Sequence, residues 1–397
     1  MILTGKTVVL GVTGSIAAYK IPNLARMLKK LGCDVQVLMT QNAVQFINPV
    51  TFESLTGNKC LIDTFDRNFQ YSVEHVALAK KADVVMIAPA SGNVIGKIAG
   101  GIADDMLTTT VMACPCKKIV SPAMNHNMYH NPIVQDNIRK LKKFGYEIVD
   151  PDPGMLANGD IGDGRMPEPE VLFEYILREI AFEKDLAGKK VLVTAGATRE
   201  PIDPVRFITN HSSGKMGIAV AKAAMLRGAE VTLVAGHCEA QLPPFVRYVP
   251  VTSAEDMFNA VTAVSSQQDI IIKAAAVADY TPVSTADKKL KKSDNDMKIE
   301  LKRTRDILKY LGENKGSGQL LCGFSMETEN VLENSAKKLA SKNCDMICAN
   351  SLRTDGAGFG TDTNLITVIT RDGAEELPMM TKDQAAHEIL DRLVNLK

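Results

Sequence analysis

The stretch KTVVLGV (Lys6–Val12) and the segment after it, SIAAYKIPNLARMLKKLG (residues 15–32), decide the fold class. The first is an almost continuous apolar run, which is typical of a parallel strand covered on both faces. The second repeats apolar residues at helical spacing and ends at Gly32, so we expect one helix there. A strand followed by a helix is the repeating unit of α/β proteins.

The same alternation continues through the first half of the chain. Further strands are predicted in DVQVLMT (34–40), ADVVMIAPA (82–90) and KKIVSPAM (117–124), with helical segments between them. This pattern predicts a doubly wound parallel sheet of the flavodoxin/Rossmann-like kind.

A charged stretch, REIAFEKDLAGKK (178–190), separates the two halves, and the pattern then restarts. We expect a strand in KVLVTAG (190–196) and a helix from about Ser213 to Arg227. Five more strands are expected, in EVTLVAG (230–236), DIIIKAAAVA (269–278), QLLCGFSM (319–326), DMICAN (345–350) and NLITVIT (364–370). We place the boundary near Asp185, with domains 1–184 and 185–397, the second also a Rossmann-like α/β domain.

Composition excludes several classes of protein. Lys and Arg number 46, as do Asp and Glu, so net charge creates no drive toward nucleic acid or membrane. No apolar run approaches the roughly 20 residues of a membrane span, and the N-terminus enters a strand without a signal peptide. Eight cysteines form no CxxC pair, so we expect buried, reduced thiols. A cytoplasmic location is predicted.

The first strand-to-helix turn, GVTGSIA (11–17), offers a phosphate site. Gly14 and Ser15 stand where a helix begins, and free backbone N–H groups there suit an anion. The spacing is not GxGxxG, and the next strand ends in Met39 and Thr40 rather than in an acid for a ribose. A mononucleotide is therefore favoured over NAD, and an NAD-dependent oxidoreductase is disfavoured. A tight turn without a ligand remains the alternative.

Other polar residues gather at the ends of the same strands. Ser91 lies in APASGN, Asp105 in GIADDMLTTT and Asn125 in SPAMNHNMY, while His75 is expected near the start of a helix. Ligands of open α/β sheets bind at this edge. For His75 and Asn125 alone, a structural role remains the alternative.

The second half carries its own candidates. NHSSGKMG (210–217) opens a helix with Ser212 and Ser213 as potential caps, but Met216 after Gly-Lys excludes a Walker A loop. Lys338 and Lys342 are four residues apart on a predicted helix and share a face. That face either grips a triphosphate or is simply solvated. DKKLKKSDND (287–296) reads as a surface loop.

Taken together, these motifs resemble a known family. GVTGSIAAYK, His75, APASGN, PAMNHNMY and GDIGDGRM are similar to the flavin-containing cysteine decarboxylases, in particular to the decarboxylase half of the bacterial bifunctional coenzyme A biosynthesis proteins. TAGATREPIDPVRFITNHSSGKMG, AAVADY, KKLKK and GFSMETEN resemble the phosphopantothenate–cysteine ligase half. The resemblance covers nearly the whole chain.

For the first domain the resemblance implies FMN. The implied flavin-binding residues are Gly14, Ser15, Thr40, Ser91 and Asp105. The implied reaction oxidises the substrate thiol to a thioaldehyde by hydride transfer to FMN, and loss of carbon dioxide then leaves an enethiolate. His75 is implied as the base or electrostatic partner and Asn125 as the ligand of the substrate carboxylate. Arg165 is expected to pair with substrate phosphate or acid groups.

One position departs from the family pattern. The loop LANGDIGDGRM (156–166) has Asn158 where the family usually has a cysteine that donates a proton as the hydride returns. An amide has no accessible proton near neutral pH, whereas a thiol of pKa about 8.5 does. Three explanations remain open: a natural variant that uses water or another group, an engineered change that traps an intermediate, or an enzyme that releases the oxidised enethiol.

For the second domain the resemblance implies CTP and Mg²⁺. The implied CTP-binding residues are Ala274, Ala275, Asp279, Asp306, Ile307, Phe324, Lys338 and Lys342. Asp279 is the implied magnesium ligand, in keeping with the oxygen ligation of that ion. Lys289 is expected to close over the reacting centre, and Asn210 to hold the acyl-cytidylate. Arg305 stands where relatives usually have proline.

The resemblance as a whole implies a two-step enzyme. 4'-Phosphopantothenate and cysteine are ligated with CTP, and the product, 4'-phosphopantothenoylcysteine, is decarboxylated to 4'-phosphopantetheine. A homo-oligomer is implied, with trimers of the flavin domain and dimers of the ligase domain forming particles such as dodecamers. The alternative is an active ligase whose N-terminal domain binds flavin but is regulatory or does not complete the decarboxylase reaction.

Overall fold

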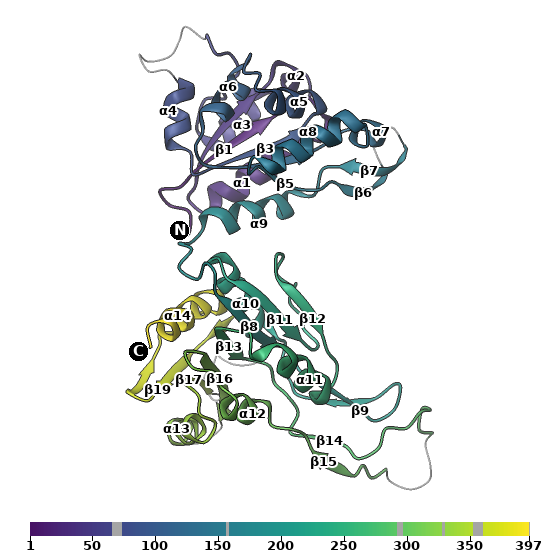
Figure 1. Cartoon of the computed structure of the whole chain (residues 1–397), viewed down its shortest axis with the longest axis vertical. Coiled ribbons are helices and arrows are strands. Elements are labelled where there is room, and N and C mark those ends of the chain that lie inside the picture. The colour runs from purple at the N-terminus through teal and green to yellow at the C-terminus, as the bar shows by residue number, and fades with distance from the viewer. Residues whose placement is uncertain (66–73, 156–158, 292–296, 328–329, 352–359, 397) are drawn as a thin grey trace. The chain divides into compact units, whose positions relative to one another are not determined.

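The computed structural model describes residues 1–65, 74–155, 159–291, 297–327, 330–351 and 360–396 (Figure 1). The chain divides into two compact units, Met1–Phe182 and Glu183–Lys397. Both are α/β units built around a mainly parallel sheet, so the predicted fold class is confirmed.

The first unit is built on five parallel strands. They are β1 (Thr7–Val12), β2 (Asp34–Met39), β3 (Val84–Ala90), β4 (Lys117–Pro122) and β5 (Glu147–Ile148). Their order in the sheet is β2-β1-β3-β4-β5, the flavodoxin-like order. The order reverses between β1 and β3, so the helices after these strands diverge and leave a crevice at their carboxyl ends.

Helices cover both faces of this sheet. On one side α1 (Ile21–Lys30) packs against α3 (Pro49–Thr56) and α9 (Pro169–Ile180), and α9 contacts β3 and β4. The helices α4 (Glu74–Lys81), α5 (Gly92–Gly100), α6 (Met106–Ala113) and α8 (Pro132–Lys143) share an apolar core with Val9 on the other side. Side chains alternate between faces along a strand, so Val8 and Leu10 point away from Val9. All three are fully buried, which explains the continuous apolar run.

The single helix expected over residues 15–32 is wrong at its start. A 3₁₀ segment, η1 (Ile16–Lys20), comes first, and α1 begins only at Ile21. The cause is Pro22, which has no N–H and fits only the first turn of an α-helix.

A two-stranded hairpin follows β5. Its strands are β6 (Asp152–Met155) and β7 (Ile161–Arg165), which pair antiparallel. The Met124 N–H donates to the Gly164 carbonyl over 3.1 Å and ties the hairpin to the segment after β4. Gly164 has φ +141°, and a Cβ there would lie 2.2 Å from the Met124 carbonyl oxygen, so only glycine allows this contact.

The second unit has a sheet of eight strands. They are β8 (Lys190–Ala195), β11 (Glu230–Ala235), β12 (Arg247–Pro250), β13 (Ile270–Lys273), β16 (Leu320–Glu327), β17 (Met346–Ser351), β19 (Ile366–Thr370) and β20 (Gly373–Glu376). The order is β12-β11-β8-β13-β16-β17-β19-β20. The first six strands are parallel, β19 pairs antiparallel with β17, and β20 pairs antiparallel with β19 at the edge. The order reverses between β8 and β13, as in Rossmann-like folds.

Helices also cover both faces of the second sheet. α10 (Lys215–Leu226) packs on β8, β11 and α14 (Lys382–Val394), while α11 (Ala254–Ser265), α12 (Ile307–Glu313) and α13 (Val331–Ser341) share an apolar core on the other face. Three short pairs complete the unit: β9 (Arg199–Pro201) with β10 (Phe207–Thr209), β14 (Tyr280–Pro282) with β15 (Leu301–Arg303), and β18 (Thr363–Asn364) with β21 (Met380–Thr381). Within the described ranges, no helix has the length and apolar character needed to cross a membrane.

The cysteines follow the expectation of buried thiols. Six of the eight are buried, and only Cys116 and Cys238 are partly exposed. Burial raises the pKa of Cys33 and Cys60 to about 12, which keeps these thiols protonated and unreactive.

Candidate active sites

A cavity of about 610 Å³ lies at the carboxyl edge of the first sheet. Its walls come from the turns after β1, β3 and β4 and from the β6–β7 hairpin. The lining residues are Gly14, Ser15, Ile16, Ala17, Tyr19, Lys20, Ser91, Gly92, Ala123, Met124, Asn125, Met128, Met155, Gly164, Arg165 and Met166. The cavity therefore occupies the crevice where the strand order reverses, the usual ligand position in such sheets.

Five of the predicted polar residues are helix N-caps. Ser15 caps η1, Thr40 caps α2 (Gln41–Val44), Ser91 caps α5, Asp105 caps α6 and Asn125 caps α7 (His126–Tyr129). Each side chain accepts a backbone hydrogen bond, at 2.8 to 3.4 Å. N-caps leave neighbouring N–H groups pointing at the same edge, so this arrangement suits an anionic ligand.

The structure brings only part of the predicted flavin set together. Gly14, Ser15 and Ser91 line the cavity, whereas Thr40 and Asp105 do not. Thr40 is buried, and its hydroxyl accepts the Ala43 N–H. Asp105 is engaged in a capping box with Thr108, and Lys97 lies 3.6 Å away. The half-buried His75, in the first turn of α4, is also absent from the cavity wall.

Sequence reasoning missed Thr13. Its side chain is fully buried, donates to the Pro89 carbonyl over 2.7 Å and accepts from the Ser91 N–H over 2.9 Å. Thr13 therefore links the turns that follow β1 and β3, on either side of the crevice. The available signal was a hydroxyl directly after an apolar strand.

Two cations stand at one end of the cavity. Lys20 is nearly buried, lies 2.8 Å from the Glu168 carboxylate and donates to the Met166 carbonyl over 3.1 Å. Arg165 pairs with the same carboxylate. These two partners hold the pKa of Glu168 below its ordinary value. Arg165 lines the cavity, and its predicted pairing with acidic groups of a substrate stays a prediction. Lys20 also lines the cavity and was missed, because it lies in a segment with the spacing of a surface helix.

Asn125 lines the first cavity and contacts the β6–β7 hairpin region through Asp160. Its Nδ2 donates to Asp160 over a long 3.5 Å, while its Oδ1 caps the following turn. Asn158, the departure from the family pattern, lies outside the described residues.

A second cavity, of about 420 Å³, lies in the second unit. The lining residues are Lys273, Val277, Asp279, Tyr280, Arg303, Thr304, Arg305, Asp306, Ile307, Leu308, Lys338 and Lys342. Five of them are cationic and two are carboxylates. This excess of positive charge suits a polyanionic ligand.

The two predicted lysines do share this cavity. Lys338 lies on α13 and donates to the Phe324 carbonyl over 2.9 Å, and Lys342 caps the end of the same helix, 2.7 Å from Asp306. Burial alone would raise the pKa of Asp306, but Lys342 and the Lys309 N–H lower it. Asp306 therefore keeps its charge here.

Lys273 was missed, although it is the one charged residue in the strand IIIK. Burial, with Lys338 nearby, lowers its pKa to about 8. A lysine with such a pKa in a cationic cavity is a candidate ligand for an added negative charge.

A smaller cavity of about 120 Å³ is lined by the start of α10 and by three predicted residues, Ala274, Ala275 and Phe324. Asn350 also lines it. Its side chain is buried, and its Oδ1 finds no hydrogen-bond partner within the described residues. Because buried polar atoms are nearly always satisfied, Asn350 is a further candidate ligand contact.

The predicted serine caps of α10 are wrong. The N-cap residue is Gly214, at φ +74°, so no side chain caps this helix. A Cβ at this position would lie 3.0 Å from the Gly196 Cα and 2.5 Å from the Cys238 Sγ. Gly214 therefore lies too close to the turn after β8 for any residue with a side chain, and this glycine, not Ser212 or Ser213, occupies the N-cap position.

The remaining ligase residues lie apart from these cavities. Asn210 is exposed and donates to the Ala276 carbonyl over 3.3 Å, and Lys289 is exposed on its loop. Neither lines the cavities above.

Arg305, by contrast, lines the cationic cavity. Its guanidinium stacks 3.6 Å over the Phe258 ring and pairs with Glu255, which anchors it to α11.

Comparison with known families fits these two sites. Residues 2–181 match the family model described as Flavoprotein, and residues 186–396 match the model described as DNA/pantothenate metabolism flavoprotein C-terminal domain. The fold and the matched models define a two-part flavoprotein of pantothenate metabolism.

Relatives that match over their full length identify the family more narrowly. The chain is 46% identical over 398 residues to the coenzyme A biosynthesis bifunctional protein CoaBC of Bacillus subtilis (strain 168), covering 99% of this chain and 98% of the relative. It is 41% identical over 397 residues to that of Escherichia coli (strain K12), with the same coverage. The chain belongs to the family of bifunctional coenzyme A biosynthesis proteins, and the predicted resemblance is confirmed.

Two solved structures are similar to single halves. The C-terminal domain of a CoaBC protein is 48% identical, with a TM-score of 0.45, and the match covers 52% of this chain and 94% of that one. A PPC decarboxylase variant complexed with pantothenoylaminoethenethiol is 30% identical, with a TM-score of 0.40, and the match covers 43% of this chain and 96% of that one.

Proposed function

We propose that residues 185–397 ligate 4'-phosphopantothenate to cysteine with CTP, and that residues 1–184 decarboxylate the product with FMN to give 4'-phosphopantetheine. The observation that carries the proposal is a pair of unlike cavities at the ligand-binding edges of two sheets. One has apolar walls and helix N-termini, and the other is strongly cationic. A flavin and a nucleoside triphosphate need these two environments.

The first cavity fits FMN. Its volume lies within the range of roughly 300–1,000 Å³ that small-molecule sites have. Gly14 and Ser15 would hold the phosphate. A Cβ at position 14 would lie only 2.6 Å from the Asn42 Cβ, so the turn requires glycine there. Ile16 and Met124 supply apolar surface for a ring system. FMN, when bound, supplies a two-electron acceptor and donor.

The chain's own residues bind and orient the substrate. The long hydrogen bond from Asn125 to Asp160 is weak, so the amide is available to a substrate carboxylate. Arg165, held by Glu168, presents a guanidinium for acidic groups of the substrate.

His75 and Asp105, both partly exposed, do not line the cavity of a single chain, so we assign them to a site completed by a second copy. Thr40 is buried in its own chain, where it caps α2. Exposed apolar residues border the cavity, among them Ile16 (58% exposed) and Tyr19 (65%). A partner that covers them would remove this surface from water. We therefore propose a homo-oligomer with the trimer-based arrangement implied by the resemblance. Sedimentation analysis of the purified protein tests it, and a monomer would contradict it.

In the ligase half, Lys338, Lys342 and Lys273 are proposed to hold the triphosphate of CTP. Asp279, exposed on the same wall, fits Mg²⁺, because this ion commonly joins one or two carboxylates to substrate phosphates. Asp306 and Ile307 shape the cavity, and Ala274, Ala275 and Phe324 line the adjoining space. Lys289 and Asn210 have to move toward this region to act on the acyl-cytidylate.

The test is a product analysis by mass spectrometry. The full-length protein is incubated with 4'-phosphopantothenate, cysteine, CTP and Mg²⁺, and separately with 4'-phosphopantothenoylcysteine. We expect ligation in the first reaction and loss of carbon dioxide in both. Lys338→Ala should abolish ligation and leave decarboxylation of the supplied intermediate intact. Equal loss of both reactions in a folded variant would contradict two separate sites.

Asn158 favours a second candidate: an active ligase whose flavin half stops after decarboxylation. The product would then be two hydrogens lighter than 4'-phosphopantetheine, with the flavin left reduced until air oxidises it. Full conversion to 4'-phosphopantetheine at the rate of the Asn158→Cys variant would exclude this candidate.

A further inference from the structure

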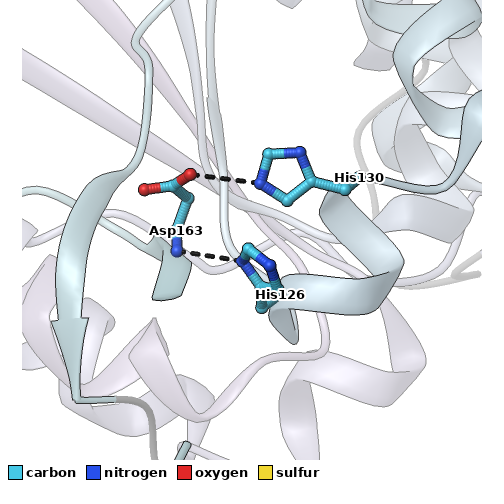
Figure 2. A group of neighbouring side chains, drawn as sticks. All are labelled: His126, His130 and Asp163. Carbon is cyan, nitrogen blue, oxygen red and sulfur yellow. Dashed lines mark hydrogen bonds and ion pairs between the residues drawn. The ribbon is translucent and has the colours of Figure 1, made fainter. Parts of the chain in front are cut away.

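Three metal-binding side chains meet beside the β6–β7 hairpin: His126, His130 and Asp163 (Figure 2). His126 is the first residue of α7 and His130 is its C-cap, and the backbone N–H of His130 donates to the His126 carbonyl over 3.0 Å. A spacing of four residues on a helical turn places side chains on the same side. The ring centroids are accordingly 4.4 Å apart.

Asp163 reaches this pair from strand β7. Its Oδ2 lies 3.1 Å from His130 Nε2, and its backbone N–H donates to His126 Nδ1 over 3.2 Å (Figure 2). The neighbouring Gly162 makes the approach possible, because a Cβ there would lie 2.5 Å from His126 Nδ1. The fold therefore fixes the approach of β7 to α7, which brings the three side chains together.

Two imidazoles and one carboxylate form a ligand set typical of zinc. One ligand atom from each residue already lies within 4.8 Å of the other two. Around a tetrahedral zinc ion with bonds of about 2.0–2.2 Å, ligand atoms are roughly 3.3 Å apart. Side-chain rotation alone covers this difference, since His130 and Asp163 are 47% and 43% exposed. The same exposure gives water access as the fourth ligand.

We propose that His126, His130 and Asp163 bind one Zn²⁺ ion. None of the three lines the cavities assigned to flavin and nucleotide, so the site is separate from both. Coordination through His126 Nδ1 replaces its hydrogen bond from Asp163. The ion then ties β7, which carries Arg165, to the turn that Asn125 caps.

The experiment is a titration of the full-length protein with Zn²⁺ alone, by isothermal calorimetry, with Co²⁺ absorption as a second readout. We expect one ion per chain. Co²⁺ in this site should show d–d bands without thiolate charge transfer, because the ligands are nitrogen and oxygen. Binding accompanied only by thiolate bands would place the ion on a partly exposed cysteine and overturn the proposal.

Variants test whether Zn²⁺ binds at this cluster or at other histidines and carboxylates. His130→Ala and Asp163→Asn should each weaken Zn²⁺ binding at least about tenfold. His237→Ala and Asp136→Asn are matched controls, because both residues are exposed and outside the cluster, and should leave the affinity unchanged. Circular dichroism confirms that each variant is folded. Unchanged affinity in both cluster variants, or no binding by the parent protein, would overturn the proposal.

Discussion

Thr13 and Ser91 are joined across the point where the strand order of the first sheet reverses, because the Ser91 N–H donates to Thr13 Oγ1 over 2.9 Å. The same hydroxyl donates to the Pro89 carbonyl over 2.7 Å. One buried side chain therefore satisfies two backbone groups on the far side of the crevice. It also fixes the position of the Ser91 cap relative to the Gly14 turn, so the proposed phosphate and flavin contacts belong to one rigid unit.

Replacing Thr13 by valine should loosen this unit. Valine keeps the shape of threonine but leaves the Ser91 N–H and the Pro89 carbonyl without a buried partner, at a cost of about 1–3 kcal/mol. The free energy of unfolding should fall in urea denaturation, and FMN should dissociate more readily, as measured by flavin absorbance after dialysis. Thr13→Ser retains the hydroxyl and should keep most of the flavin. Equal stability of Thr13→Val and the parent would show that the bridge contributes nothing.

The pKa of Lys273 predicts a pH dependence. Its folded value of about 8 is lower than the ordinary 10.5, so between these values the unfolded chain binds more protons. The contribution of this group to stability therefore rises as pH increases through that window. A triphosphate favours the charged amine, so CTP binding should take up a proton above pH 8 and weaken as pH rises.

Calorimetry near about pH 9, in two buffers of different ionisation enthalpy, measures the proton uptake. Lys273→Met should abolish it. Lys309→Met, an exposed lysine on α12 paired with Glu313, is the control and should preserve it. Identical uptake in Lys273→Met would assign the proton to another group.

Restoring the family residue at position 158 should complete the decarboxylase reaction. Asn158→Cys introduces a thiol with a pKa of about 8.5, which is able to donate a proton where an amide is not. We expect more 4'-phosphopantetheine and less of the product two hydrogens lighter, in a single-turnover assay with mass detection. Asn158→Ser, which has no acidic thiol, is the control. No difference between the cysteine and serine variants would mean that water or another group supplies the proton.

Asn350 should affect substrate binding rather than folding. Its buried Oδ1 has no partner within the described residues, so removing the amide costs the empty protein little or stabilises it. Asn350→Ala should raise the KM of the ligase reaction at least about tenfold at unchanged melting temperature. Ser335→Ala removes another buried hydroxyl that has no partner in the described part of the chain, away from both ligase cavities, and should leave KM unchanged. A large drop in Tm for Asn350→Ala would show a structural role.

Much of the fold was predictable because its causes are local. The apolar runs that became β1, β3 and β8 are buried on both faces, which removes polar residues from every position of a strand. Ser15, Ser91 and Asn125 were recognisable as polar residues that come within three positions of the end of a strand, although only the structure showed that all three cap helices. The error at α1 was also local in origin, since Pro22 signals where a helix can start.

Other residues became informative only through contacts across the chain. Thr13 acts through a residue 78 positions away, and His130 meets an aspartate 33 positions away. Lys273 looked like an ordinary end of a strand until the structure placed it near Lys338. These relations depend on strand order and register, which periodicity in a sequence does not specify.

The sequence by itself determined the strand and helix segments, the α/β class and, through its motifs, the family, because apolar spacing and short turn signals act between neighbours in the chain. Only the tertiary structure decided which predicted residues share a cavity. It gathered Ser15, Ser91 and Asn125 at one edge and left Lys289 outside. It also brought Asp163 to the two histidines, because sheet topology sets the distances between residues remote in sequence.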